Sequence, residues 1–385
     1  MQSHLTTQER AIHQQARDFV AQYLPLDVVL KADREARFPM DVWRVMASQA
    51  WPARFIARPW GEGAPLGMLV AALEGLAYGD ITLTSALQRT ACFGGHLLEQ
   101  WAESALQERL LPAIASGEAL ISFALTEHEA GSDAAALSCR ARPASGGYLL
   151  NGTKIYTGGA QVAHTILVAA RIEGTSGKEG ITLFAVPAAA PGLDIQPMDT
   201  LGHRGVGVST VRLSEVAVDA GTVIGPPGGG WNVIMSSVGR ERLQVAAICV
   251  GAAERVLDLA VEHAGRRVQF GRRLFDFQAI QHQLTDMWML LESAREMLHE
   301  TVARAELEGD DPPRSILAKL VASEAFWQIA DRGLQVAGGT GYLLDSYFQF
   351  ALREARLYRI GGGTSEVLRT VVGRHLAKGM NTSPW

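Results

Sequence analysis

The sequence predicts an α+β protein in which a sheet-forming segment is flanked by two helical segments. Apolar residues recur at helical spacing before residue 117 and again after residue 231. Between these stretches, short β-rich runs alternate with glycine and proline clusters. We therefore expect an N-terminal helical domain at 1–117, a central β-barrel or β-sandwich domain at 118–225 and a C-terminal four-helix bundle at 226–385.

The first block predicts three helices. Thr6-Thr7-Gln8-Glu9 has the pattern of a capping box, and it precedes an apolar helical stripe. That stripe consists of Ile12, Ala16, Phe19 and Val20. The run 68–77 is almost wholly apolar and predicts a buried helix, and 101–114 predicts another helix that ends at Ser116-Gly117.

The second block predicts short strands, for example at 165–168 and 181–186. Clusters at 145–147 and 191–192 predict the turns between them, and 226–230 predicts the linker that leaves the block.

The third block predicts long helices. A first helix carries an apolar stripe made of Leu243, Ala247, Val250, Leu257 and Val261. A second covers 279–307, and Pro312-Pro313 begins a third.

Composition excludes several classes of protein. With 48% hydrophobic residues the chain can bury a sizeable core, and its net charge of −5 comes without a basic cluster, so no nucleic-acid partner is expected. No apolar run reaches the roughly 18 residues of a membrane span, and the N-terminus lacks a signal-peptide pattern. The three cysteines are far apart in the sequence. We expect a soluble, cytoplasmic protein with no membrane partner.

Common catalytic motifs are absent from the sequence. The glycine clusters 228–230 and 338–341 do not match a phosphate loop, and no Gly-x-Ser-x-Gly occurs. The ten histidines are scattered, so no metal is expected.

Five motifs, in order along the whole chain, resemble those of the acyl-CoA dehydrogenase family. They are Leu125–Asp133, Asn151–Lys154, Gln269–Arg272 with Phe277–Gln281, Gln335–Gly339, and Gly363–Glu366. The resemblance implies the acyl-CoA dehydrogenase fold and FAD as cofactor. Hydrogen-bond donors at the flavin would stabilise the negative charge of its reduced form. The FAD contacts implied by the resemblance are Phe123, Leu125, Thr126, Ser132, Tyr156, Thr157, Gly158, Arg267, Phe270, Gln278, Gln335, Gly338, Gly339, Thr364 and Glu366.

Taken singly, these residues have simpler interpretations. Thr126 could be a turn residue, Arg267 a solvated charge and Phe270 a core side chain. Gly158 also departs from the family pattern, because it stands where the family has the threonine that bonds flavin N5. Either Thr157 or a backbone amide would replace that contact.

A second departure concerns the catalytic base. Gly362 stands where many members carry the glutamate that removes the substrate's α-proton. The isovaleryl- and long-chain-type members place that glutamate in a Glu-Arg-Leu context, which here makes Glu241 the candidate base. The alternative interpretation is that Glu241 is a carboxylate at a helix N-terminus, stabilised by the helix dipole.

Substrate contacts are also implied by the resemblance. Arg242 would contact the pantetheine chain or form an ion pair, Ser132 would also contact substrate, and the Gly362 N–H would bond the thioester carbonyl. Because Gly362 has no side chain, the site suits a branched or bulky acyl group.

The expected function is FAD-dependent α,β-dehydrogenation of an acyl-CoA to the trans-2-enoyl thioester, with electron-transfer flavoprotein as acceptor and a homotetrameric assembly. Three alternatives share the fold. They are a dehydrogenase of carrier-protein-tethered acyl or aminoacyl groups, a flavin monooxygenase or oxidase, and a non-catalytic flavin-binding scaffold.

Overall fold

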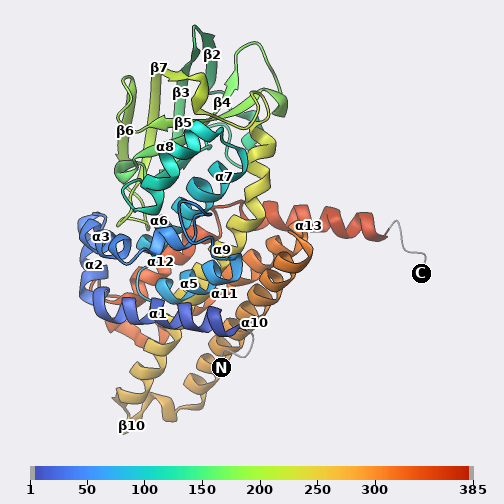
Figure 1. The fold of residues 1–385 in the computed structure, drawn as a ribbon. Helices are drawn as coiled ribbons and strands as arrows, with labels where there is room; N and C mark the ends of the chain where they lie inside the picture. The colour runs from blue at the N-terminus through green and yellow to red at the C-terminus, as the bar shows by residue number, and fades with distance from the viewer. Residues whose placement is uncertain (1–4, 381–385) are drawn as a thin grey trace. The chain divides into compact units, whose positions relative to one another are not determined.

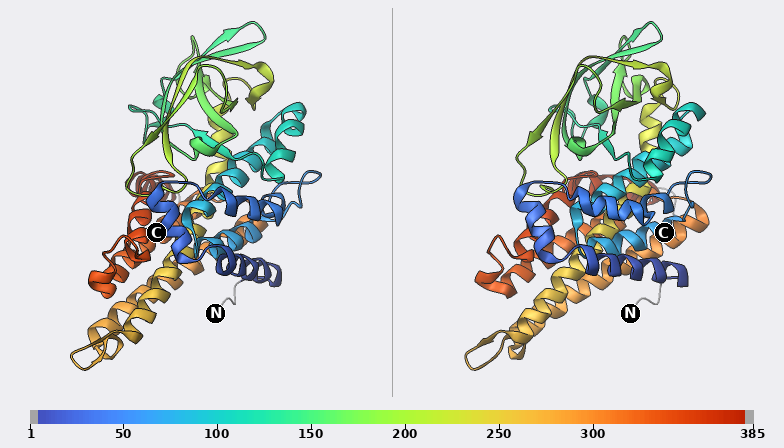
Figure 2. Two further views of the ribbon diagram at one scale, coloured as in Figure 1. Left: turned by 90° about the vertical axis from the view of Figure 1, so that its left-hand side faces the viewer. Right: turned by 60° about the vertical axis from the view of Figure 1, so that its left-hand side comes forward.

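The computed structural model describes residues 5–380 and confirms the predicted α+β class, with helices before and after a central sheet (Figures 1 and 2). The outer ends of the first and third predicted blocks, residues 1–4 and 381–385, lie outside the described range. The chain divides into two compact units. The helical unit contains the segments up to 33, 65–84 and from 239 onwards, and the sheet unit contains 34–64 and 85–238.

The α-helices are α1 (Thr7–Tyr23), α2 (Leu26–Glu35), α3 (Met40–Ser48), α4 (Trp51–Arg54), α5 (Leu66–Ala77), α6 (Ile81–Arg89), α7 (Leu97–Trp101), α8 (Ser104–Ala115), α9 (Gly230–Arg266), α10 (Gln278–Glu308), α11 (Pro312–Ala337), α12 (Tyr347–Tyr358) and α13 (Ser365–Met380). The strands are β1 (Ile121–Ala124), β2 (Arg140–Ala144), β3 (Gly147–Gly158), β4 (Thr165–Ile172), β5 (Ile181–Pro187), β6 (Leu193–Met198), β7 (Val208–Asp219), β8 (Val223–Ile224), β9 (Val268–Gln269) and β10 (Arg272–Arg273).

Local sequence explains the start of the helical unit. The Thr6 hydroxyl accepts a hydrogen bond from the Glu9 N–H at 3.2 Å, and the Glu9 carboxylate accepts one from the Thr6 N–H at 2.7 Å. This is the predicted capping box, which satisfies backbone donors that the helix leaves open. The predicted stripe is buried, so both the start and the inner face of α1 are confirmed.

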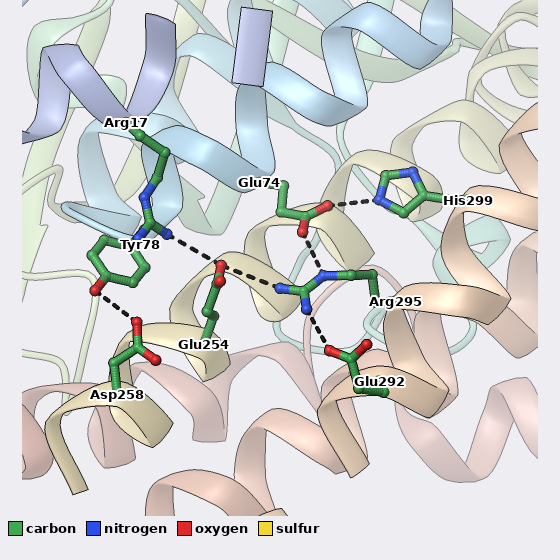
Figure 3. A network of polar contacts seen from close by, with 8 residues as sticks. All are labelled: Arg17, Glu74, Tyr78, Glu254, Asp258, Glu292, Arg295 and His299. Carbon is green, nitrogen blue, oxygen red and sulfur yellow. Dashed lines mark hydrogen bonds and ion pairs between the residues drawn. The ribbon is translucent and has the colours of Figure 1, made fainter. Parts of the chain in front are cut away.

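A polar network lies inside the helical unit and joins α1, α5, α9 and α10 (Figure 3). Arg295 contacts Glu74 at 2.8 Å and Glu254 at 3.2 Å, and His299 contacts Glu74 at 2.8 Å. Arg17 reaches Glu254 at 3.1 Å. Burial by itself would raise the pKa of Glu74, but His299 and Arg295 hold it well below its usual range. The buried carboxylate is therefore fully compensated.

The strands of the sheet unit form one mixed sheet in the order β6-β7-β3-β2-β4-β5-β8, and β1 pairs with β4 in parallel. The pairing of β3 with β7 shifts register between Lys154 and Thr157. Tyr156 within this bulge has a φ of 54°, a conformation that side chains rarely adopt. The irregularity therefore falls inside a stretch predicted to contact the flavin.

Three details differ from the sequence predictions. The helix predicted at 101–114 is instead α8, which begins at Ser104 because α7 ends at Trp101. α9 begins at Gly230, which is the last residue of the segment 226–230 predicted as a linker. Val261, predicted to lie in the buried stripe of α9, is 41% exposed, whereas the other members of that stripe are buried. No helix among residues 5–380 is long and apolar enough to cross a membrane.

Candidate active site

In the sheet unit, the segment after β1 and the end of β3 lie side by side. The Ile155 N–H donates to the Thr126 carbonyl at 2.9 Å, and the Ser122 hydroxyl donates to the Gly158 carbonyl at 2.9 Å. These bonds bring the turn Leu125–Thr126 and the pair Thr157-Gly158 together, although about thirty residues separate them in the sequence.

The aromatic residues predicted near the flavin differ in their surroundings. The Phe123 ring stacks on the Phe93 ring, with 4.4 Å between centroids and 11° between planes. Tyr156 is 63% exposed, and Ser132 is exposed in the loop that follows β1. Phe123 is therefore held by packing within the sheet unit, whereas Tyr156 and Ser132 present their side chains at its surface.

A buried ion pair fixes the turn that carries Thr126, and sequence reasoning missed it. The Lys154 ammonium lies 2.7 Å from the Glu127 carboxylate and donates to the Leu125 carbonyl at 3.0 Å. Glu127 also accepts the Cys139 N–H at 2.9 Å. Burial favours a higher pKa for Glu127, but Lys154 outweighs this and lowers it. Both residues lie inside the recognised motifs, but nothing in the sequence around them marks them as a pair.

The end of β3 carries a buried hydroxyl group that could form a hydrogen bond with a cofactor. The Thr157 hydroxyl is buried and has no hydrogen-bond partner among residues 5–380. Such a group is costly unless a ligand completes its bonding. A Cβ placed on Gly158 would lie 3.5 Å from the Arg89 guanidinium, a neighbour that the sequence did not indicate. These residues fit a polar cofactor edge at this point.

In the helical unit, a cavity of about 470 Å³ is lined by the end of α9, the turn that follows α11 and the start of α12. Its lining residues are Leu259, Glu262, His263, Arg266, Arg267, Thr340 and Phe348. Next to Thr340, a Cβ on Gly338 or Gly339 would meet nothing within 4 Å, so this backbone is open to a ligand. Of the two arginines in the lining, Arg266 forms an ion pair with Glu262, and Arg267 could donate to a diphosphate.

The remaining FAD contacts predicted in the helical unit are Phe270, Gln278 and Gln335. Phe270 is 93% exposed in the turn between β9 and β10, with a φ of 51°. Gln278 begins α10 and Gln335 lies near the end of α11, and both side chains are exposed. The structure therefore leaves them accessible at the surface of the helical unit and does not bury them in its core.

The candidate base lies against the glycine that replaces the family glutamate. A Cβ built on Gly362 would lie 3.3 Å and 3.4 Å from the two carboxylate oxygens of Glu241. Gly362 has a φ of 65°, in the left-handed region. The carboxylate from α9 thus fills the space that a side chain at residue 362 would enter.

The interpretation of Glu241 as a carboxylate at a helix N-terminus is wrong. α9 begins at Gly230, so Glu241 lies in the third turn of the helix or beyond. The effect of a helix dipole falls off within the first turn. The position of Glu241 needs another explanation.

The charge of Glu241 is governed by burial and by two cations. Burial raises the pKa of Glu241, and Lys319 and then Arg242 oppose the rise. Burial also lowers the pKa of Arg242. The negative charges of Glu241 and Asp310 act in the opposite direction, because they favour its charged form. The Nε atom of Arg242 is buried and has no hydrogen-bond partner within 5–380. A desolvated carboxylate of this kind is a stronger base than one in water.

The glycine loop between α12 and α13 is held by α11. The Lys319 ammonium donates to the Gly363 carbonyl at 3.0 Å, and the Ser365 hydroxyl donates to Glu324 at 2.7 Å. The Thr364 hydroxyl accepts the Val367 N–H at 3.2 Å and so caps α13, and Glu366 is exposed in its first turn. Sequence reasoning missed Lys319, whose signal is a lone lysine in the apolar run 315–322.

Comparison with known proteins shows the family to which the chain belongs. The chain matches the family descriptions for the acyl-CoA dehydrogenase N-terminal domain at 6–118, middle domain at 122–216 and C-terminal domain at 228–377. The chain therefore belongs to the acyl-CoA dehydrogenase family. As such it is an FAD-dependent oxidoreductase, and the predicted family, enzyme class and cofactor are confirmed.

Particular relatives span nearly the whole chain. A mitochondrial 2-methylacyl-CoA dehydrogenase of Solanum tuberosum is 33% identical over 90% of this chain and 85% of its own length. The isovaleryl-CoA dehydrogenase of Oryza sativa subsp. japonica is 31% identical over 97% of this chain and 91% of its own. Butyryl-CoA dehydrogenase from Megasphaera elsdenii has a similar structure, with a TM-score of 0.92, 28% identity and coverage of 97% and 99%. A prolyl acyl carrier protein oxidase is also similar, with a TM-score of 0.91, 28% identity and the same coverage.

Proposed function

We propose that this enzyme oxidises an acyl-CoA thioester to its trans-2-enoyl form, with Glu241 as the base. The observation that carries the proposal is the carboxylate of Glu241 in the space beside Gly362. A base there would stand in for the glutamate that many family members carry at the Gly362 position. Burial of Glu241 favours the proton-accepting role, because a higher pKa makes a carboxylate a better acceptor for a carbon-bound proton.

The rest of the helical site is assigned to substrate. The Gly362 N–H would donate to the thioester carbonyl and so acidify the α-carbon. Arg242 would bond the pantetheine chain, which agrees with its unpartnered Nε atom. Bound FAD supplies the acceptor for the β-hydride.

FAD contacts are assigned separately in each unit. In the sheet unit, Phe123, Leu125 and Thr126 would border the flavin ring. We favour Thr157 over a backbone amide for the missing N5 contact, because its buried hydroxyl has no partner in the described part of the chain. In the helical unit, Arg267 and the open backbone of Gly338–Gly339 would bind the diphosphate.

A branched acyl group is the proposed substrate class. Two of the relatives are named for 2-methylacyl-CoA and isovaleryl-CoA, which supports this class. We also propose a homotetramer that passes electrons to an electron-transfer flavoprotein. Large apolar side chains exposed on α9, α10 and the β9–β10 turn support self-association. They are Val261, Val268, Phe270, Trp288 and Met289.

An anaerobic substrate panel tests this proposal. The purified protein should carry about one FAD per chain and lose its oxidised-flavin absorbance faster with isovaleryl-CoA or 2-methylbutyryl-CoA than with butyryl-CoA. Light scattering on the same sample should give the mass of a tetramer. A protein without flavin, or one that no acyl-CoA reduces, would disprove the proposal.

A second candidate is oxidation of a carrier-bound aminoacyl group, which is favoured by the similarity to the prolyl carrier-protein oxidase. The panel therefore includes a prolyl thioester on a carrier protein, assayed with and without oxygen. Faster flavin reduction by this thioester than by every acyl-CoA would replace the first proposal with the second.

A further inference from the structure

We propose that Lys319 is a positioning residue for catalysis, which anchors the glycine loop through Gly363 and supplies a positive charge near Glu241 without an ion pair. This inference rests on the proposed role of Glu241 as the base. It assigns a task to a side chain that neither touches substrate nor belongs to the recognised motifs.

The first support is the contact with the loop. The Lys319 ammonium donates to the Gly363 carbonyl at 3.0 Å, and Gly363 follows the glycine that faces Glu241. Gly362 and Gly363 have φ values of 65° and 91°. Two successive residues in this region are unusually free to move, so an anchor is needed to keep the Gly362 backbone in place.

The second support is the way Lys319 is buried. Its side chain is 0% exposed, and no carboxylate in the described range forms an ion pair with it. Burying an ammonium with one neutral acceptor is costly, so such an arrangement calls for a role beyond packing. Burial lowers the pKa of Lys319, and nearby negative groups act against this.

The titratable groups around Lys319 and Glu241 show which carboxylate is influenced by the charge of Lys319. On α9 they are Glu241, Arg242 and the Cys249 thiol, on α11 Glu324, and before α11 Asp310. Burial raises the pKa of Cys249 far above neutrality, so this thiol carries no charge. Glu324 is already bonded to Ser365 and Arg359. Glu241 is therefore the carboxylate whose charge depends on Lys319.

A cation that does not touch the base has a chemical advantage. A direct ion pair would lower the pKa of Glu241 strongly and weaken it as a base. With less positive charge near it, a buried carboxylate has a higher pKa and holds a proton more readily. A lysine bound to the neighbouring carbonyl avoids both outcomes.

The first experiment follows the pH dependence of flavin reduction. Lys319→Met, Lys319→Arg and the control Lys31→Met, an exposed lysine on α2, are compared from pH 6 to pH 9 with isovaleryl-CoA. Lys319→Met should slow reduction about tenfold or more at pH 6, since protonated Glu241 accepts no proton. The loss should shrink towards pH 9, where Glu241 ionises without help. Lys319→Arg should keep the parent's profile, as should Lys31→Met.

The second experiment measures hydrogen–deuterium exchange of peptides that cover 359–366. Exchange should be faster in Lys319→Met than in Lys31→Met. A loss of rate that is equal at every pH would overturn the electrostatic role, and unchanged exchange would overturn the anchoring role. If Lys319→Arg fails to fold, the two measurements on Lys319→Met decide. If Glu241→Gln keeps the parent rate, the proposed base is wrong, yet the exchange experiment still tests the anchor.

Discussion

Among the residues whose burial the structure describes, each unit has one completely buried lysine, and the two lysines are used differently. In the sheet unit, Lys154 touches the Glu127 carboxylate at 2.7 Å. In the helical unit, Lys319 bonds the Gly363 carbonyl and forms no ion pair with a carboxylate of the described chain. The pKa of Glu127 is lowered, whereas that of Glu241 is raised.

The difference shows how distance separates a structural charge from a reactive one. A carboxylate in direct contact with a cation is held ionised and has no capacity left for a proton. A buried carboxylate whose cation lies farther away keeps a raised pKa and so remains basic. Glu127 therefore suits the fixing of a turn, and Glu241 suits proton abstraction.

The largest expected effect is on catalysis in the helical unit. Glu241→Gln should retain FAD but slow flavin reduction by about 10³–10⁴-fold, since general-base removal costs up to that amount. Stopped-flow absorbance with the best acyl-CoA measures the rate, and Glu127→Gln serves as the comparison at equal FAD content. A near-parent rate for Glu241→Gln would show that the proton acceptor lies elsewhere.

The next effect is on stability in the sheet unit. Lys154→Met should destabilise the fold by about 3–5 kcal/mol, because it leaves the buried charge of Glu127 without a cation. Adding Glu127→Leu should recover part of that loss, since both charges are then gone. Denaturant unfolding measures the change, with the exposed Lys178→Met as control. Lys319→Met should cost less than Lys154→Met, and the reverse order would remove the distinction between the two lysines.

A smaller effect should come from moving the carboxylate back. Glu241→Ala with Gly362→Glu should regain about tenfold of the rate lost in Glu241→Ala alone, because a side chain at residue 362 starts beside the place that the Glu241 carboxylate occupies. The gain is limited by the left-handed φ of residue 362, which costs a side chain about 1–3 kcal/mol. Glu241→Ala with Gly362→Gln is the control, and equal rates for the two double variants would contradict the shared position.

The smallest effect is on thermal stability, and its sign differs between the units. The lowered pKa of Glu127 stabilises the fold above the unfolded pKa, and this stability is lost as pH falls. The raised pKa of Glu241 means that its ionisation at neutral pH costs stability, which returns as pH falls. Glu241→Gln should therefore raise the melting temperature at pH 7 by about 1–2 °C, and Glu127→Gln should lower it. Melting curves at several pH values test the signs, and shifts in the same direction would contradict them.

Much of the fold could be predicted because its information is local. The capping box at Thr6 and the proline at the start of α11, Pro312, act within one helical turn. They can therefore be recognised in the sequence. The start of α9 at Gly230 was missed, because a glycine-rich segment predicts a linker on propensity and only its packing makes it helical. Val261 was misplaced for a related reason, since helical periodicity marks an apolar face but not whether a neighbour covers it.

The sequence by itself determined the family, the order of the helical and sheet-forming blocks, and the choice of Glu241 as candidate base, because motifs and periodicity are properties of neighbouring residues. Only the tertiary structure decided that the Glu241 carboxylate lies against Gly362 and that Lys319 holds the next residue. These residues come from three separate segments of the chain. Their distances depend on how α9, α11 and the loop after α12 pack together, and that arrangement is fixed by burial over the whole unit rather than by any local pattern.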